Sequence, residues 1–224
     1  MRSFGIEIEL LDIDLVTFSK TFRLPFTNCC ITDFSQCTME GQRFPNGSRR
    51  HIPGCVGCGT DMKVYWHIIR EAAYADCLLF EVISPILNDF NQIKHLCNVL
   101  RLSGAVVDPN RGGLHVHIDA TGMSDRQLIG IFEKYKRNEC EIDKMVAERR
   151  RGDIGCVCAR SLKHMDFASV TTSSELCNLF NDKFYKVNAL SLKKYGTLEF
   201  RQHEATIDFP EITKWVSFIQ SICE

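Results

Sequence analysis

Hydrophobic and acidic residues alternate near the start of the chain. In FGIEIELLDI, at residues 4–13, the isoleucines fall on one side of an extended backbone, while Glu7 and Glu9 fall on the other. Alternation of this kind is typical of a half-buried β-strand. The pattern predicts a strand with two neighbouring carboxylates on its polar face.

Two later segments also have the pattern of strands. Residues 78–84 are mostly apolar, contain Glu81 and are followed by Pro85. A charge in such a run is uncommon unless it is paired or bound to a metal. Residues 114–120 alternate cleanly and place His115 and His117 on one face. Both segments therefore predict strands that carry chemically useful side chains.

A pair of strands is predicted near the end of the chain, at residues 185–192 and 197–203. In the second strand, Glu199, Arg201 and His203 are spaced to share one face, alternating with apolar residues. A glutamate beside an arginine indicates either a structural ion pair or a phosphate-binding pair, and the sequence leaves both interpretations open.

Periodicity of 3.6 residues predicts the helices. They are expected at residues 90–102, 124–150, 174–180 and from 208 onward. Ser124 and Gln127 have the spacing of a capping box, and Asp208 precedes a proline in the manner of a helix start. Strands and helices alternate without a regular βαβ period, so the sequence predicts one α+β domain over residues 1–224 with a largely antiparallel sheet.

Residues 27–60 have no clear period and contain prolines, glycines and five of the twelve cysteines. We interpret them as a Cys-rich loop insertion. Cys55 and Cys58 form a Cys-x-x-Cys, and Cys37 lies upstream. A structural Zn²⁺ site, plain loop thiols and redox or catalytic cysteines remain the three interpretations, because no second Cys-x-x-Cys completes a zinc motif.

Net charge and hydropathy limit the classes of partner that this chain is expected to bind. Lysines and arginines number 27 against 28 acidic residues, a net charge of −1, so nothing drives the chain toward nucleic acid or an anionic membrane. Acidic residues interrupt the apolar N-terminus, which argues against a signal peptide and for a cytoplasmic protein. The basic run at 149–151 is expected to be a solvated helix end, with phosphate binding as the alternative.

The polar strand residues suit a hard cation. Carboxylates with few imidazoles favour Mg²⁺ or Mn²⁺ over structural zinc, and a nearby arginine completes the equipment for phosphoryl transfer. The alternatives are a solvated outer face for the glutamates and a zinc hydrolase for the His-x-His. The candidate residues are Glu7, Glu9, Glu81, His115, His117, Glu199 and Arg201.

Four short motifs, in order along the chain, resemble those of the amidoligase family within the superfamily of glutamine synthetase and glutamate–cysteine ligase. They are FGIEIE, FEVISPIL, GGLHVHID and GTLEFRQHEAT, and they extend from Phe4 to Thr206. The resemblance implies a half-barrel of antiparallel strands, like the glutamine synthetase catalytic domain, with helices packed outside. It also implies ATP-dependent joining of a carboxylate to an amine through an acyl phosphate.

The resemblance also implies roles for individual residues. Arg201 and His117 would meet the ATP phosphates, with Glu9 beside them, and Arg201, Glu199 and Asp61 would be catalytic. Asp61 stands where family members have an acidic turn, but it lacks the Gly-Ser that follows there, and Asp76 is a rival. The residues implied to hold the divalent metals are Glu7, Glu9, Glu81, His115 and Glu199.

Two other classes of function compete with a ligase. A metal-dependent hydrolase would use the His-x-His strand to activate water and would not need ATP. A zinc-stabilised binding module would be a ligase fold with a decayed site, although every matched charged position is present. The sequence leaves the carboxylate and amine substrates open, whether small molecules or peptides.

We predict that any tightly held zinc belongs to the Cys-rich segment and not to the glutamate strands, because thiolates bind zinc more strongly than carboxylates do. The double variant Cys55→Ser/Cys58→Ser should lose the zinc that the wild type retains after dialysis, as measured by elemental analysis. A folded double variant with its zinc content unchanged would contradict this prediction.

Overall fold

The computed structural model describes residues 1–24, 26–28, 66–74, 77–151 and 159–224. Almost all of the predicted insertion at 27–60 lies outside these residues. The three zinc candidates and Asp61 lie outside them too. Asp76, the rival of Asp61, lies outside them as well.

The described strands form one seven-stranded sheet in the order β2-β3-β4-β1-β5-β7-β6. Their bounds are β1 Phe4–Leu10, β2 Phe26–Asn28, β3 Trp66–Tyr74, β4 Cys77–Ile83, β5 Gly113–Asp119, β6 Val187–Asn188 and β7 Thr197–Glu204. β2 pairs with β3 in parallel, and every other pairing is antiparallel. The α+β class and the largely antiparallel sheet are confirmed, and the strands described do not close into a barrel.

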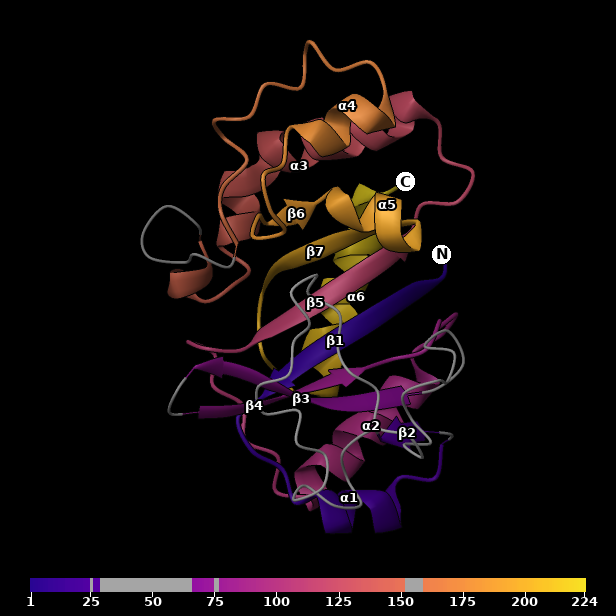
Figure 1. Cartoon of the computed structure of the whole chain (residues 1–224), viewed down its shortest axis with the longest axis vertical. Helices are drawn as coiled ribbons and strands as arrows, with labels where there is room; N and C mark the ends of the chain where they lie inside the picture. The colour runs from indigo at the N-terminus through magenta and orange to yellow at the C-terminus, as the bar shows by residue number, and fades with distance from the viewer. Residues whose placement is uncertain (25, 29–65, 75–76, 152–158) are drawn as a thin grey trace, which may run out of the picture.

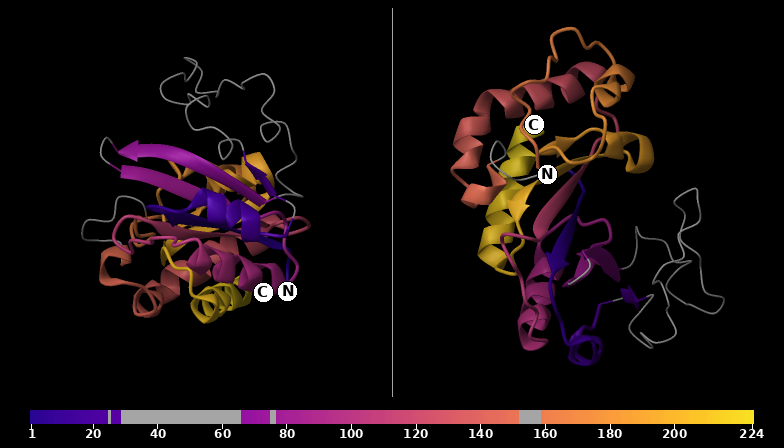
Figure 2. Two further views of the ribbon diagram at one scale, coloured as in Figure 1. Left: turned by 90° about the horizontal axis from the view of Figure 1, so that it is seen from below. Right: turned by 60° about the vertical axis from the view of Figure 1, so that its left-hand side comes forward.

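Three long helices cover one face of this sheet (Figures 1 and 2). They are α2 Asn91–Leu102, α3 Asp125–Asp143 and α6 Phe209–Ile222. The alternation of β1 explains the packing, because its apolar residues are buried in the core beneath these helices while its glutamates stay partly exposed on the other side. No helix in the described part of the chain is long and apolar enough to cross a membrane.

Shorter helices complete the described fold: α1 Leu15–Thr21, α4 Ser173–Asn178, α5 Leu190–Tyr195 and a 3-10 turn at Glu148–Arg150. The predicted capping box at Ser124 and Gln127 is present, and Asp208 caps α6. The helix predicted over 124–150 ends at Asp143. Beyond it the chain turns inward, where the Ala147 amide donates to the Glu204 carboxylate at 2.9 Å.

The strand predicted at 185–192 is wrong beyond Asn188. Only Val187–Asn188 is extended, and α5 follows directly. The Asn188 side-chain oxygen accepts a hydrogen bond from the Leu190 amide at 2.8 Å, which turns the chain, and leucines and lysines then favour a helix. Gly196 ends the helix with a φ of 69°, a left-handed conformation that favours glycine.

A bulge in β7 moves His203 off the face predicted for it. Val116 pairs with Phe200 and Leu114 with His203, so β7 has one residue more than β5 between these pairs. His203 consequently packs against Trp215 of α6, with ring centroids 4.9 Å apart. The extra residue reverses the alternation that the sequence pattern assumes.

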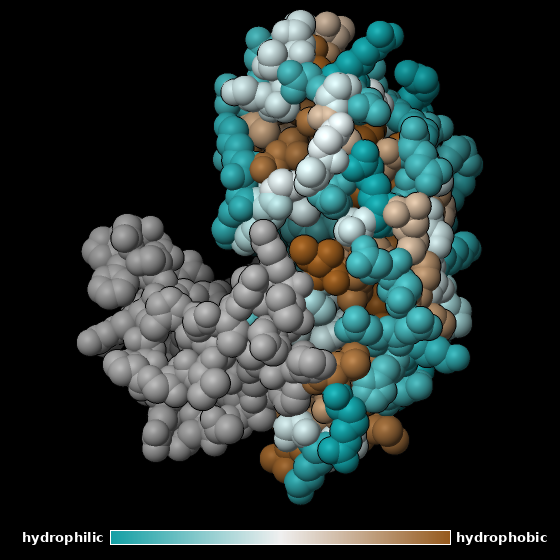
Figure 3. Space-filling model, turned by 90° about the vertical axis from the view of Figure 1, so that its right-hand side faces the viewer, coloured by the Kyte–Doolittle hydropathy of each residue, from teal (hydrophilic) through white to brown (hydrophobic). Residues whose placement is uncertain are grey.

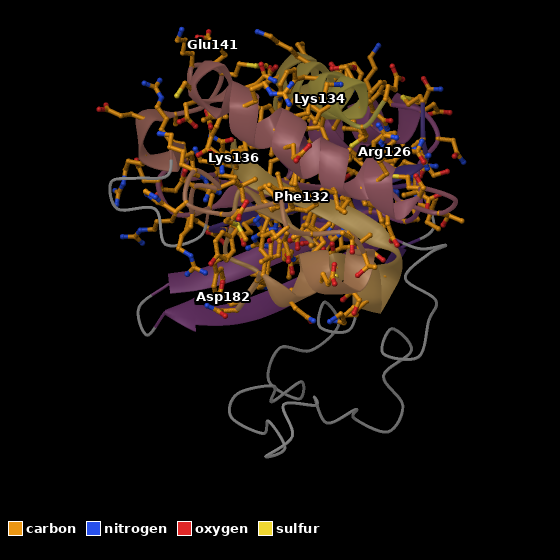
Figure 4. The ribbon with its side chains drawn as sticks, turned by 90° about the horizontal axis from the view of Figure 1, so that it is seen from above. Arg126, Phe132, Lys134, Lys136, Glu141 and Asp182 are labelled. Atoms are coloured by element: carbon orange, nitrogen blue, oxygen red, sulfur yellow. The ribbon has the colours of Figure 1, made fainter. Side chains whose placement is uncertain are left out.

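A buried ionic network ties α3 to the strand region. The Lys186 ammonium is fully buried and lies 2.7 Å from Glu139 and 2.6 Å from Asp143, both on α3. Gln202 joins the network by donating to Asp143 at 2.5 Å. At the outer side of α3, Lys134 reaches α6 and donates to the Ser221 carbonyl at 2.7 Å (Figure 4).

We predict that Lys186→Met destabilises the protein by ~3–5 kcal/mol, because it leaves the buried Glu139 and the partly buried Asp143 without their cation. Lys144→Met is the matched control, since Lys144 forms an exposed pair with Glu141 at the end of the same helix, and it should cost at most ~0.5 kcal/mol. Urea unfolding of both variants measures the difference. Equal losses would mean that the network contributes no more than a surface pair.

Candidate active site

The candidate residues meet on the face of the sheet opposite the three long helices. They come from the four adjacent strands β4, β1, β5 and β7, and strand pairing sets their positions. Glu9 pairs with Glu81, Glu7 with His115, and His117 with Glu199. The residues are far apart in sequence, and the antiparallel register brings them into neighbouring rows.

His115 lies at the centre of the cluster. Its Nδ1 is 3.2 Å from Glu7 and 3.9 Å from Glu199, and its Nε2 is 3.9 Å from Glu9. Around His115, potential ligand atoms form two groups in which all atoms lie within 4.8 Å of one another. One group is Glu7, His115 and Glu199, the other is Glu9, Glu81 and His115, and the shared histidine joins them.

His117 lies beside this cluster and contacts it through Glu7. Its Nε2 is 3.2 Å from the Glu7 carboxylate, and its Nδ1 is 3.0 Å from the Thr197 hydroxyl. Thr197 lies two residues before Glu199, and so on the same face of β7, a spacing that could have identified it as a candidate from the sequence.

Glu199 and Arg201 form a buried ion pair on β7, with exposed fractions of only 5% and 3%. Asn188 donates to the other Glu199 oxygen at 2.6 Å. Arg201 also approaches the His115 ring at 3.4 Å, yet no described group forms a hydrogen bond with its Nε. A buried guanidinium nitrogen without a partner is costly, so this nitrogen is available to a ligand.

Opposing charges dominate the electrostatics of the cluster. Burial alone would raise the pKa of Glu7, but its hydrogen bonds with His115 and His117 outweigh burial and hold the pKa well below its ordinary value. Burial alone would lower the pKa of His117, but Glu7 and Glu199 raise it. For Glu199, burial is outweighed by the positive charge of Arg201, which lowers its pKa.

Gly112 and Gly113 allow the backbone to approach the cluster closely. The Gly113 amide donates to Glu9 at 2.6 Å, and a Cβ at Gly113 would lie only 2.8 Å from His115 Nε2. Arg150 lies behind them, buried, and donates to the Gly112 carbonyl at 2.9 Å. The expectation that the run at 149–151 is a solvated helix end is therefore wrong for Arg150, because no local pattern distinguishes it from its two neighbours.

The donor set fits a hard divalent cation. Four carboxylates surround one imidazole within two adjacent groups, and crowded carboxylates repel one another unless protons or cations intervene. Each group contains a single histidine, so neither offers the multiple imidazoles or thiolates that zinc prefers. The described residues that would hold Mg²⁺ or Mn²⁺ are Glu7, Glu9, Glu81, His115 and Glu199.

A family model described as "Putative amidoligase enzyme" matches residues 32–223, which is most of the chain. No curated protein matches the sequence.

We predict that the metal-free protein loses thermal stability as the pH rises above neutral. The contribution of His117 is fully present below the ordinary histidine pKa of about 6.5, and it is lost as the pH rises through the raised pKa in the folded protein. Thermal melts in a chelator between about pH 6 and 9 should show this loss, and His117→Gln should flatten the profile. Parallel profiles for the two proteins would contradict the assignment.

Proposed function

The chain belongs to the amidoligase family, and on that premise we propose that it is an ATP-dependent carboxylate–amine ligase that forms an amide bond through an acyl phosphate. The observation that carries the proposal is the pair of ligand groups joined by His115, with the unpartnered Arg201 Nε beside them. The carboxylate-lined antiparallel sheet supports a glutamine synthetase-like catalytic domain.

The proposed reaction has two steps. An oxygen of the substrate carboxylate attacks the γ-phosphorus of ATP, and ADP leaves. The amine nitrogen then attacks the carbonyl carbon of the acyl phosphate, phosphate leaves, and the amine gives its proton to a carboxylate of the site. The products are the amide, ADP, phosphate and one proton.

The charges of the site match the needs of the first step. ATP and a carboxylate repel each other, and the proposed Mg²⁺ or Mn²⁺ ions, when bound, offset that repulsion and stabilise charge on the transferred group. Arg201 and His117 bind phosphate oxygens in this proposal, and Asn188 and Thr197 hold Glu199 and His117 in position. Asp61 is retained as a proposed catalytic residue from the family resemblance.

The donor set favours this function over a metal-dependent hydrolase. A zinc hydrolase needs several imidazole ligands for one ion, whereas each ligand group around His115 contains one imidazole, and His117 belongs to neither. The His-x-His motif therefore contributes one candidate metal ligand and one phosphate-binding side chain.

We predict that turnover releases ADP and phosphate and depends on Mg²⁺ or Mn²⁺. ATP is incubated with pooled carboxylic acids and amines, nucleotide products are separated by chromatography, and condensed products are detected by mass spectrometry. Release of AMP and pyrophosphate would indicate adenylate chemistry instead, and ATP binding that a chelator leaves unchanged would contradict the metal assignment.

We predict that Arg201→Lys lowers ATP turnover but leaves the stability of the fold almost unchanged. Lysine keeps a cation beside Glu199 but lacks the guanidinium geometry, so stability should change little while turnover falls, approaching the ~10³–10⁵-fold loss typical of removing such an arginine. Arg201→Ala should lose turnover and also stability, by ~3–5 kcal/mol, because Glu199 is left buried and unpaired.

Arg160→Lys is the control for an arginine–carboxylate pair outside the site, because Arg160 pairs with Asp182 at 2.5 Å, although both of these side chains are 39% exposed. Melting curves and ATP turnover are measured for all three variants. Full turnover in Arg201→Lys would mean that Arg201 acts only as a structural ion pair.

A further inference from the structure

A pocket of about 580 Å³ opens beside the candidate active site, at the end of the sheet where β1 and β7 begin and β5 ends. This volume lies within the ~300–1,000 Å³ range of small-molecule sites. Its described lining includes Glu7 and His117, so it is continuous with the site. Figure 3 faces this side of the molecule and shows small hydrophobic patches among hydrophilic surface.

The two ends of the pocket carry carboxylates. Glu7 lies at the inner end, and Asp119 lies further along the same face of β5. Glu7 pairs with His115, and 119 − 115 = 4 residues separate His115 from Asp119, which is roughly 13 Å along a strand.

Apolar groups form the walls between these carboxylates. Ile83, Pro85 and Ile86 line the pocket, and Ile86 is half exposed, at 50%. Gly5 forms part of the floor, where a Cβ would make ordinary contacts of 3.4 Å with the Ser84 hydroxyl and 3.9 Å with His117. The absence of a side chain at Gly5 therefore leaves the floor open, with room for an alkyl chain above it.

The polar groups of the lining are mostly engaged already. The Ser84 hydroxyl donates to the Pro85 carbonyl and accepts from the Ile6 amide, both at 2.8 Å. Asp119 accepts from the Thr121 amide at 2.9 Å but forms no ion pair with any described residue. The lining thus offers two carboxylates, of which Asp119 has no cation paired with it among the described residues, and this suits an ammonium group.

The described lining has one lysine, Lys194, and it lies at the rim. It is exposed, and its Nζ lies 4.6 Å from the ring centroid of Tyr195, which is exposed as well. The phosphate-binding candidate Arg201 does not line the pocket and lies beside Glu199 and His115. The pocket therefore lies outside the part of the site that Arg201 occupies.

We propose that this pocket binds an aliphatic diamine as the amine substrate, with one ammonium group held by Asp119 and the reacting amine at Glu7. The identification as a substrate rests on the proposed ligase function, whereas the binding does not. A diamine satisfies a carboxylate at each end and places its alkyl chain against the apolar walls. A monoamine of equal length would leave Asp119 unpaired.

The test compares diamines with a monoamine, which carries one positive charge fewer, and with adenosine. Calorimetry measures binding of 1,4-diaminobutane, 1,6-diaminohexane, hexylamine and adenosine to the full chain, with Mg²⁺ and an ATP analogue in a separate titration. At least one diamine should bind about tenfold more tightly than hexylamine, because a hydrogen-bonded charge pair contributes more than a neutral contact.

Two variants locate the site. Asp119→Asn keeps an oxygen for the Thr121 amide but removes the charge, so it should reduce diamine affinity to that of hexylamine and leave hexylamine unchanged. Gly5→Ala should weaken both amines by narrowing the floor, and thermal melts check that each variant folds. Binding of the ATP analogue should be the same in both variants and the wild type.

The outcomes distinguish this proposal from the ligase function. Diamine binding that depends on Asp119, without any ATP turnover, would keep the pocket and reject the ligase. Turnover with diamines binding no more tightly than hexylamine would overturn the diamine assignment alone. Adenosine binding that Gly5→Ala weakens, together with weaker binding of the ATP analogue, would make the pocket a nucleoside site and overturn the proposal.

Discussion

Repulsion among carboxylates on one face of a sheet is the constraint on which the rest of this structure depends. Glu7 and Glu9 project from β1 beside Glu81 and Glu199, and all four approach the same imidazole. Such a cluster is unfavourable without protons or cations. The rigid strands hold the carboxylates together because the opposite face of β1 is buried in the core, so the charges cannot separate without breaking the sheet.

Polar contacts hold this arrangement in place both within the site and on the helix side of the sheet. Within the cleft, Arg201 and Asn188 each engage one oxygen of Glu199 and thereby orient it. On the helix side, Lys186 binds two carboxylates of α3, and its own carbonyl accepts from the Arg201 amide at 2.9 Å. The backbone of Arg201 is therefore fixed by the residue that anchors α3, which links the precision of the site to the packing of a helix.

The sequence allowed prediction of the features that depend on local spacing. Alternation in β1 and β5 located the glutamates and histidines, and capping residues located the starts of α3 and α6. The bulge in β7 escaped prediction because an extra residue leaves no mark on apolar spacing, and it moved His203 to the helix side. The burial of Arg150 was not predicted either, because only tertiary packing distinguishes Arg150 from the arginines on either side of it.

The pairing of strands that lie far apart in the sequence could not be predicted from residue spacing either. Nothing in the local pattern places Glu9 opposite Glu81, because their strands are separated by most of the first third of the chain. The family resemblance identified these residues as members of one site but did not show how they are arranged. The strand register shows the arrangement, in which His115 belongs to both ligand groups. A motif can thus identify the members of a site, whereas strand order determines which of them share a ligand.

The proposed amine pocket places two opposing demands on its ligand. A carboxylate near an ammonium group favours the charged form, which binds well but cannot attack a carbonyl carbon. Apolar walls such as Ile83 and Pro85 disfavour charge and promote loss of the proton. A diamine divides these demands between its ends, because the group at Asp119 can remain charged and bind. The group at Glu7 lies beside His117 and the carboxylates of the cleft, where a proton can leave as the acyl phosphate forms.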